Sequence, residues 1–192
     1  MTCRSICFLL ASMLLCAAAT AASIDDVVLP DTVSINGFDR PLVLNGAGMR
    51  KKWFISVYVG ALYLPQRQAG VGDLLQSPPA NRVAMHFVYS KVAKRQLAEG
   101  WREGFENNLT EAQLNAVAAR LDRFVGLFGD MREGETVWLD FVPGRGTEVS
   151  VNGTPLGMIE GDDFNSALLS VWLGKEPVTI ELKNAMVGVD KD

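Results

Sequence analysis

Cysteine and histidine are almost absent from this chain of 192 residues. The three cysteines, Cys3, Cys7 and Cys16, all fall within the first 22 residues, and His86 is the single histidine. Beyond residue 22 the sequence therefore offers no thiol catalyst, no disulfide and no cysteine-ligated zinc. A histidine-rich metal site is excluded as well, and a Ser-His-Asp triad would have to use His86.

The chain also lacks an excess of positive charge, since 18 basic and 22 acidic side chains give a net charge of -4. This balance excludes nucleic-acid binding through a basic surface and provides no general attraction to anionic membranes. No apolar stretch reaches the ~20 residues of a membrane span. Gly46-Ala47-Gly48 lacks the third glycine of a dinucleotide-binding loop. We expect neither a metal nor a cofactor.

The first 22 residues are typical of a secretory signal peptide. Arg4 supplies the positive start, residues 6–15 are apolar, and small side chains surround a cleavage point near Ala21 or Ala22. We therefore predict an exported protein, periplasmic or secreted, with one domain over residues 23–192. All three cysteines would be removed with the signal peptide.

Strand patterns dominate the first part of that domain. Residues 24–44 suggest short strands and an N-terminal hairpin, with its strongest turn signal at Asn36-Gly37. Gly46-Ala47-Gly48 then interrupts the pattern. Residues 53–64 form an almost unbroken apolar run, which predicts a strand covered on both faces. Another strand is expected over residues 82–89.

Two helices and a second group of strands follow. Apolar residues recur at helical spacing from Leu97 to Phe128, and Thr110 with Gln113 forms a capping box between the two helices. Residues 137–151 and the segment after Asn152-Gly153 alternate as a three-stranded meander, and a third helix starts near Asp162 or Asp163. This order is typical of an α+β fold, an open-faced sandwich in which helices cover one face of a large, mostly antiparallel sheet.

Arg50 and Tyr58 are the residues most suggestive of a binding site. Arg50 follows Gly46-Ala47-Gly48, where the backbone can approach another group closely, and Tyr58 carries a phenol into an apolar strand. Together they would suit the carboxylate of an apolar ligand, although a core tyrosine bonded to the backbone is the alternative. Eight residues of straight strand span ~26 Å. The chain must therefore turn between them, and Lys51-Lys52 is the candidate turn.

Two long segments resemble proteins of the chalcone isomerase fold, especially exported bacterial chalcone isomerase-like proteins. One covers residues 42–65, LVLNGAGMRKKWFISVYVGALYLP, and the other covers residues 138–188, which begin WLDFVPGRGTEVSVNG. The resemblance extends over nearly all of residues 23–192. It implies that family's open-faced sandwich, the same α+β arrangement that the hydrophobic patterns predict.

The resemblance carries over to individual residues. In the plant enzymes, which close a chalcone to a flavanone, an arginine assists the reaction, and Arg50 corresponds to it. At four further positions those enzymes have other, polar residues, and this chain departs from them. The residues here are Tyr58, Ala93, Gly100 and Val171. Loss of such fixed donors costs ~100-fold or more in rate each, so the resemblance does not imply chalcone isomerase activity.

The non-catalytic branch of this family binds fatty acids, and it has an arginine and a tyrosine at these two positions. The resemblance therefore implies that Arg50 neutralises the carboxylate of a fatty acid or similar apolar ligand and that Tyr58 hydrogen-bonds it. The ligand would lie in a cleft between sheet and helices. Trp101, Phe105 and Trp172 are the candidate wall residues.

Two other functions stay open. The domain would be an intramolecular lyase or isomerase if Arg50 acted as an electrostatic catalyst on an apolar, enone-type substrate. It would be a protein-interaction scaffold if its own side chains filled the cleft and its surface bound another exported protein. Gly46-Ala47-Gly48 beside Arg50 argues against a scaffold, because a close backbone approach is hard to explain in a sealed core.

Overall fold

The computed structural model of the protein describes residues 22–189, so all of the predicted signal peptide except Ala22 lies outside the described residues. Its centre is a seven-stranded antiparallel sheet in the order β11-β10-β9-β6-β5-β4-β3. The strands of this sheet are β3 (Thr32–Val33), β4 (Leu42–Lys52), β5 (Ile55–Leu64), β6 (Asn81–Phe87), β9 (Thr136–Val142), β10 (Gly146–Val151) and β11 (Thr154–Ile159). Two small antiparallel pairs accompany it, β1 (Ala22–Ile24) with β2 (Val27–Leu29) and β7 (Lys91–Val92) with β8 (Met131–Arg132).

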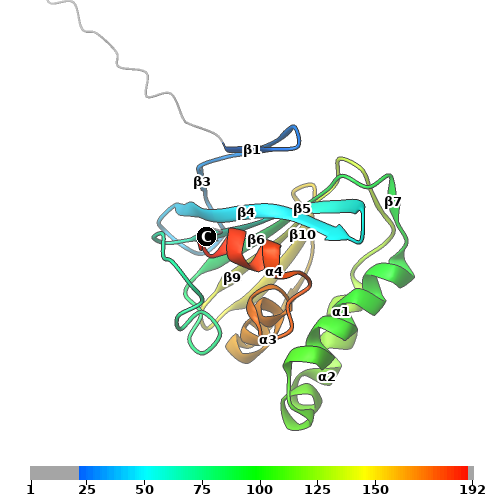
Figure 1. Cartoon of the computed structure of the whole chain (residues 1–192). Helices are drawn as coiled ribbons and strands as arrows, with labels where there is room; N and C mark the ends of the chain where they lie inside the picture. The colour runs from blue at the N-terminus through cyan, green and yellow to red at the C-terminus, as the bar shows by residue number, and fades with distance from the viewer. Residues whose placement is uncertain (1–21, 190–192) are drawn as a thin grey trace, which may run out of the picture.

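The helices lie together on one face of the sheet, as Figure 1 shows, while β1 and β2 lie on the other. They are α1 (Lys94–Asn108), α2 (Glu111–Gly126), α3 (Asp162–Leu173) and α4 (Ile180–Met186). This arrangement confirms the predicted α+β open-faced sandwich. The expected capping box of α2 is present, because the Thr110 side chain accepts a hydrogen bond from the Gln113 backbone while Gln113 accepts one from the Thr110 backbone.

Each face of the sheet has its own apolar core. The larger core lies under the helices and includes Leu62, Val83 and Phe87, and the smaller one lies under residues 27–44 and includes Tyr63. Because strand side chains alternate between faces, β5 is buried from both sides, as its apolar sequence predicts. The N-terminal hairpin of β1 and β2 turns at Asp25-Asp26, whereas the predicted turn at Asn36-Gly37 lies in the longer loop that joins the antiparallel pair β3 and β4.

The glycines before Arg50 lie within β4 rather than interrupting it. A Cβ atom on Gly46 would lie 2.1 Å from the Ala185 carbonyl oxygen, and one on Gly48 would lie 2.7 Å from the Ala185 Cβ. Both glycines therefore allow α4 to pack directly on β4. The predicted close backbone approach is real, but the group approached is a helix of the same chain.

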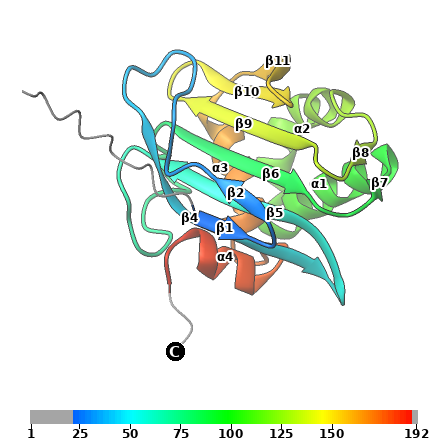
Figure 2. The same ribbon diagram turned by 90° about the horizontal axis from the view of Figure 1, so that it is seen from above.

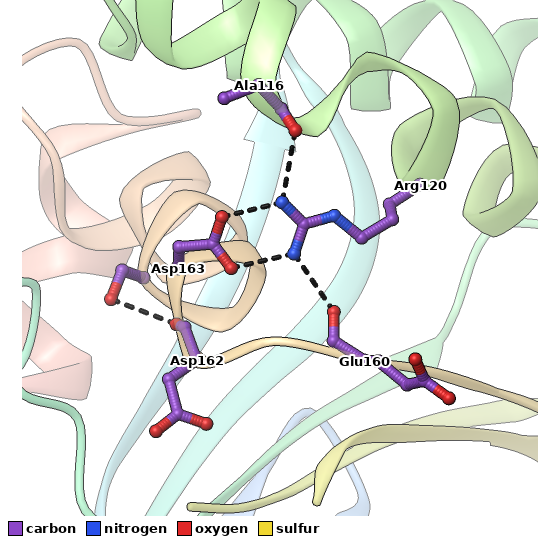
Figure 3. Close-up of polar contacts among 6 residues, drawn as sticks. Ala116, Arg120, Glu160, Asp162 and Asp163 are labelled. Atoms are coloured by element: carbon purple, nitrogen blue, oxygen red, sulfur yellow. Dashed lines mark hydrogen bonds and ion pairs between the residues drawn. The ribbon is translucent and has the colours of Figure 1, made fainter. Parts of the chain in front are cut away.

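A clamp around Arg120 fixes the start of α3 against α2, as Figure 3 shows. Its guanidinium donates to both carboxylate oxygens of Asp163, at 2.6 and 2.7 Å, and to the carbonyl oxygens of Glu160 and Ala116. The helix begins at Asp162, as expected, with Gly161 as its N-cap and the acidic Asp162 and Asp163 in its first turn. These hydrogen bonds hold one side of the helical layer.

Candidate functional site

The β4–β5 hairpin brings Arg50 directly opposite Tyr58. The guanidinium carbon of Arg50 lies 5.6 Å from the centre of the Tyr58 ring, so the two residues share the helix-covered side of the sheet. The turn that makes this possible is Trp53-Phe54, two residues later than the predicted turn at Lys51-Lys52, which lies within β4. The ~26 Å separation of a straight strand is thereby avoided.

Tyr58 is held by a side chain and not by backbone. Only 4% of it is exposed, and its hydroxyl oxygen accepts a 2.9 Å hydrogen bond from Nε1 of Trp172 on α3. Burial raises the pKa of Tyr58, although Arg50 and the Trp172 hydrogen bond oppose the shift. The phenol is therefore neutral at pH 7, and its own proton has no acceptor among the described residues.

An inner pocket of about 70 Å³ lies between the sheet and α1, next to these two residues. Its lining is mostly apolar, and consists of Arg50, Val57, Tyr58, Met85, Phe87, Val92, Gln96, Leu97, Gly100, Trp101, Val171 and Val178. A wider groove of about 450 Å³ shares part of this lining, including Arg50, Val57 and Gly100, so the two spaces adjoin. The groove alone falls within the ~300–1,000 Å³ range of small-molecule sites.

The three aromatic residues predicted to form the wall have different positions. Trp101 lines the inner pocket and is 3% exposed, and among the described residues its Nε1 has no hydrogen-bond partner. Trp172 lies behind Tyr58 and is fully buried. Phe105 is also fully buried, against Phe164, and neither it nor Trp172 lines the pocket or the groove. The structure therefore places only Trp101 on the wall.

Gly100 lies one turn before Gly104 on α1. From the sequence, Gly100 was notable only as a position where the plant enzymes have a polar residue. A Cβ on Gly104 would meet Val171 at 2.9 Å, so that glycine serves the packing of α1 on α3. A Cβ on Gly100 would meet nothing within 4 Å, and Gly100 lines both the pocket and the groove. A glycine inside a helical pattern was the available signal, because such a residue weakens a helix.

The electrostatics around the pocket favour an anion. Arg50 is half-buried and makes no ion pair with any residue between 22 and 189. The groove adds three further cations and two anions, namely Lys52, Lys91, Arg95, Glu99 and Glu103. In a chain of net charge -4, this local excess of positive charge would attract a carboxylate.

The opposite face of the sheet carries a buried ion pair that the sequence analysis did not identify. Arg82 donates to both carboxylate oxygens of Asp140, at 2.5 and 2.6 Å, and its guanidinium lies 4.5 Å from the Trp138 ring. His86 is on the same face, where its Nδ1 lies 2.8 Å from the Thr136 hydroxyl and burial lowers its pKa. Neither residue reaches the pocket. Within residues 22–189 no cluster of side chains suited to a metal ion occurs.

None of the described helices is long and apolar enough to cross a membrane.

Comparison with known proteins identifies the family of this chain. No curated protein matches the chain. The crystal structure of a fatty-acid-binding protein from Arabidopsis thaliana matches with a TM-score of 0.69 and 17% sequence identity, over 88% of this chain and 96% of that one. The two proteins share a fold. A model of the chalcone isomerase-like family matches residues 21–188, and the chain therefore belongs to the chalcone isomerase-like family.

Proposed function

We propose that this protein is a non-catalytic binding protein for a fatty acid or a similar apolar carboxylate, held in the pocket and groove between the sheet and α1. One observation carries the proposal. Arg50, Tyr58 and Trp101 line one pocket whose other lining is mostly apolar, and the Arg50 guanidinium, the Tyr58 hydroxyl proton and Nε1 of Trp101 have no acceptor among residues 22–189.

Tyr58 and Trp101 are buried, and buried donors without acceptors are rare in folded proteins, because each loses its hydrogen bonds to water. A carboxylate has two oxygens with about four acceptor sites, enough for a bidentate arginine and a phenol. Arg50 would supply the charge and Tyr58, oriented by Trp172, would supply a neutral donor. Trp101 would donate to the same head group or to a water bound beside it.

The space left open at Gly100 supports the same proposal. A glycine in the middle of a helix lowers stability by about 1 kcal/mol relative to alanine. At Gly100 no neighbouring atom is close enough to exclude a side chain. A ligand that passes α1 at this point would account for it. Because the inner pocket measures only about 70 Å³, we place the head group there and most of the acyl chain along the groove.

The structural neighbour from Arabidopsis thaliana, described as a fatty-acid-binding protein, supports the choice of ligand. The pocket lining supports binding over catalysis. Gly100 and Val171, which align with polar positions of the plant enzymes, both line the pocket and offer no polar group. None of the inner pocket's described lining residues is an acid, a histidine or a lysine that would serve as general base, and the carboxylates of Glu99 and Glu103 line only the wider groove. This favours the binding protein over the lyase or isomerase.

The structure removes one argument against the protein-interaction scaffold and supplies another. The packing of α4 explains Gly46 and Gly48, so they no longer argue for a ligand. The open pocket next to Arg50, however, is the feature that a sealed scaffold would lack.

Titration with two ligands of equal chain length tests the proposal. We expect the protein to bind hexadecanoate, and Arg50→Ala to weaken this binding at least about tenfold. The same change should leave binding of hexadecanol, which lacks the carboxylate, nearly unaltered. Arg102→Ala is the matched control, because Arg102 pairs with Asp122 and lines neither pocket nor groove. Equal hexadecanoate affinity in parent and Arg50→Ala would exclude the proposed role of Arg50.

Export is part of the proposal and has its own test. A protein expressed with its native N-terminus should accumulate outside the cytoplasm and begin near Ala22 or Ser23. Organic extraction of that material, followed by mass spectrometry, should recover about one acyl chain per protein. A protein that retains residues 1–21 in the cytoplasm would contradict the export proposal and leave the ligand proposal intact.

A further inference from the structure

The tip of the β4–β5 hairpin, residues 51–55, exposes large apolar side chains to solvent. Phe54 is 100% exposed and Trp53 84%, the highest values for large hydrophobic residues between 22 and 189. Ile55, the next residue, is also exposed, at 43%. Figure 2 shows the β4–β5 hairpin projecting beyond the neighbouring strands. The tip therefore contributes little to the packing of the fold.

The backbone at the tip gives a second, independent observation. Trp53 has a φ of 56°, in the left-handed region. The other non-glycine residues with positive φ in the described chain are Asp25, Asp26 and Asn152, types whose short polar side chains tolerate this region. A bulky tryptophan is an unfavourable choice for such a turn, where glycine or asparagine would fit. Because neither the turn nor the core favours a tryptophan at this position, we infer that its exposed side chain contacts a partner outside the chain.

Basic residues surround these aromatic side chains. Lys51 and Lys52 are exposed and make no ion pair with any described residue. Lys91 and Arg95 lie across the groove from the tip, partly neutralised by Asp130 and Glu99, respectively. The net charge of the chain gave no reason to expect attraction to anionic membranes. At this end of the molecule the local charge has the opposite sign.

We propose that the hairpin tip docks on the surface of an anionic phospholipid bilayer. Trp53 and Phe54 would enter the interfacial layer, where aromatic side chains are preferred, and Lys51 and Lys52 would contact the lipid phosphates. A second copy of the chain suits the tip less well, because a symmetric pair would bring two basic tips together. The docking does not depend on what the pocket binds.

The docking would also orient the groove. Trp53, Lys52 and Ile55 belong both to the tip and to the groove lining. A tip inserted into the headgroup layer therefore places the groove entrance at the membrane surface. A ligand of low solubility would then move between bilayer and groove without crossing bulk water.

Sedimentation with vesicles tests the proposal. We would use residues 22–192, which contain every described element and lack the apolar residues 6–15 that would themselves bind lipid. The protein should sediment with phosphatidylglycerol vesicles at low salt, less at high salt, and poorly with phosphatidylcholine. The double variant Phe54→Ser/Lys51→Gln should bind phosphatidylglycerol at least about tenfold more weakly. Val28→Ser/Lys175→Gln, which removes an exposed apolar side chain on β2 and an exposed basic side chain after α3, should bind like the parent.

Tryptophan fluorescence provides a second readout. Trp53 is the exposed tryptophan, since Trp101, Trp138 and Trp172 are partly or fully buried. Phosphatidylglycerol vesicles should shift the emission of the parent to shorter wavelength, and Trp53→Phe should abolish that shift.

Three results would overturn the docking proposal. They are no sedimentation of the parent with phosphatidylglycerol, equal binding by parent and Phe54→Ser/Lys51→Gln, and a lipid-independent dimer that this variant dissociates. The proposed ligand binding is measured separately, because Phe54 and Lys51 line neither pocket nor groove. That variant should keep the hexadecanoate affinity of the parent, so failure of one proposal is distinguishable from failure of the other.

Discussion

Arg50 and Arg82 lie in the same sheet, on opposite faces, and they differ in what surrounds their charge. Arg82 is buried, bonded through two nitrogens to Asp140 and covered by Trp138. Arg50 is half-buried beside Tyr58, next to an open pocket, and has no carboxylate partner among residues 22–189. The comparison teaches that a charged residue is recognised as structural or functional by whether the fold already satisfies it.

The largest effect is expected where the charge is satisfied. Asp140→Ala leaves the buried Arg82 guanidinium without its partner, so we expect the free energy of unfolding to fall by about 3–5 kcal/mol. Urea denaturation followed by circular dichroism measures it. The double variant Arg82→Met/Asp140→Leu should recover most of the loss, since it removes both charges. If Asp140→Ala unfolds like the parent, the pair contributes nothing to stability and the contrast with Arg50 fails.

The converse is expected for Arg50. Arg50→Ala should change the free energy of unfolding by no more than about 0.5 kcal/mol, because no described carboxylate loses a partner. Its effect should fall on hexadecanoate affinity, where loss of charge-assisted hydrogen bonds of about 1.5–3 kcal/mol corresponds to roughly 10- to 100-fold. Parallel urea and calorimetric titrations of parent and variant measure both quantities. A variant that lost stability and kept its affinity would make Arg50 structural, like Arg82.

Local patterns predicted much of the fold, and long-range pairings did not follow from them. The capping box of Thr110 with Gln113 spans three residues, so its signal is contained in the sequence. Arg82 and Asp140 are 58 positions apart, and nothing in either segment identifies the other. The same holds for Tyr58 and Trp172, 114 positions apart.

The apolar run from Trp53 shows a second limit of sequence patterns. Its hydrophobicity predicted a buried strand from the first residue, and β5 is indeed buried from Tyr58 onward. Trp53 and Phe54 are instead the exposed turn. Hydrophobicity alone cannot distinguish a residue that packs in a core from one that contacts something outside the chain. The pairing of Arg50 with Tyr58 likewise follows only from the position of the turn at Trp53-Phe54.

A smaller effect is expected at Gly100, where the pocket side of the comparison can be tested by filling space. Gly100→Ala should stabilise the protein by up to about 1 kcal/mol, because alanine favours α1 and meets no neighbour. Gly100→Leu should project toward the pocket and the groove, both of which Gly100 lines, and weaken hexadecanoate binding severalfold, without loss of stability. Thermal unfolding and calorimetric titration measure the two effects. Undiminished affinity in the leucine variant would place the ligand elsewhere.

The smallest effect is expected at the exposed pair of Arg120 and Asp163, whose side chains are 27% and 58% exposed. The hydrogen bonds from Arg120 hold the pKa of Asp163 below its usual range. Its contribution is therefore fully present above the unfolded pKa of about 3.9 and is lost as the pH falls through the lower, folded pKa. Because the pair is solvated, we expect the free energies of unfolding of parent and Asp163→Asn to differ by less than about 1 kcal/mol at pH 6, and this difference to shrink as the pH falls below about 3.9. Urea denaturation over a series of pH values measures it. A difference that did not shrink would mean that Asp163 supports α3 through the shape of the clamp and not through its charge, which would bring this exposed pair closer in kind to the buried pair at Arg82.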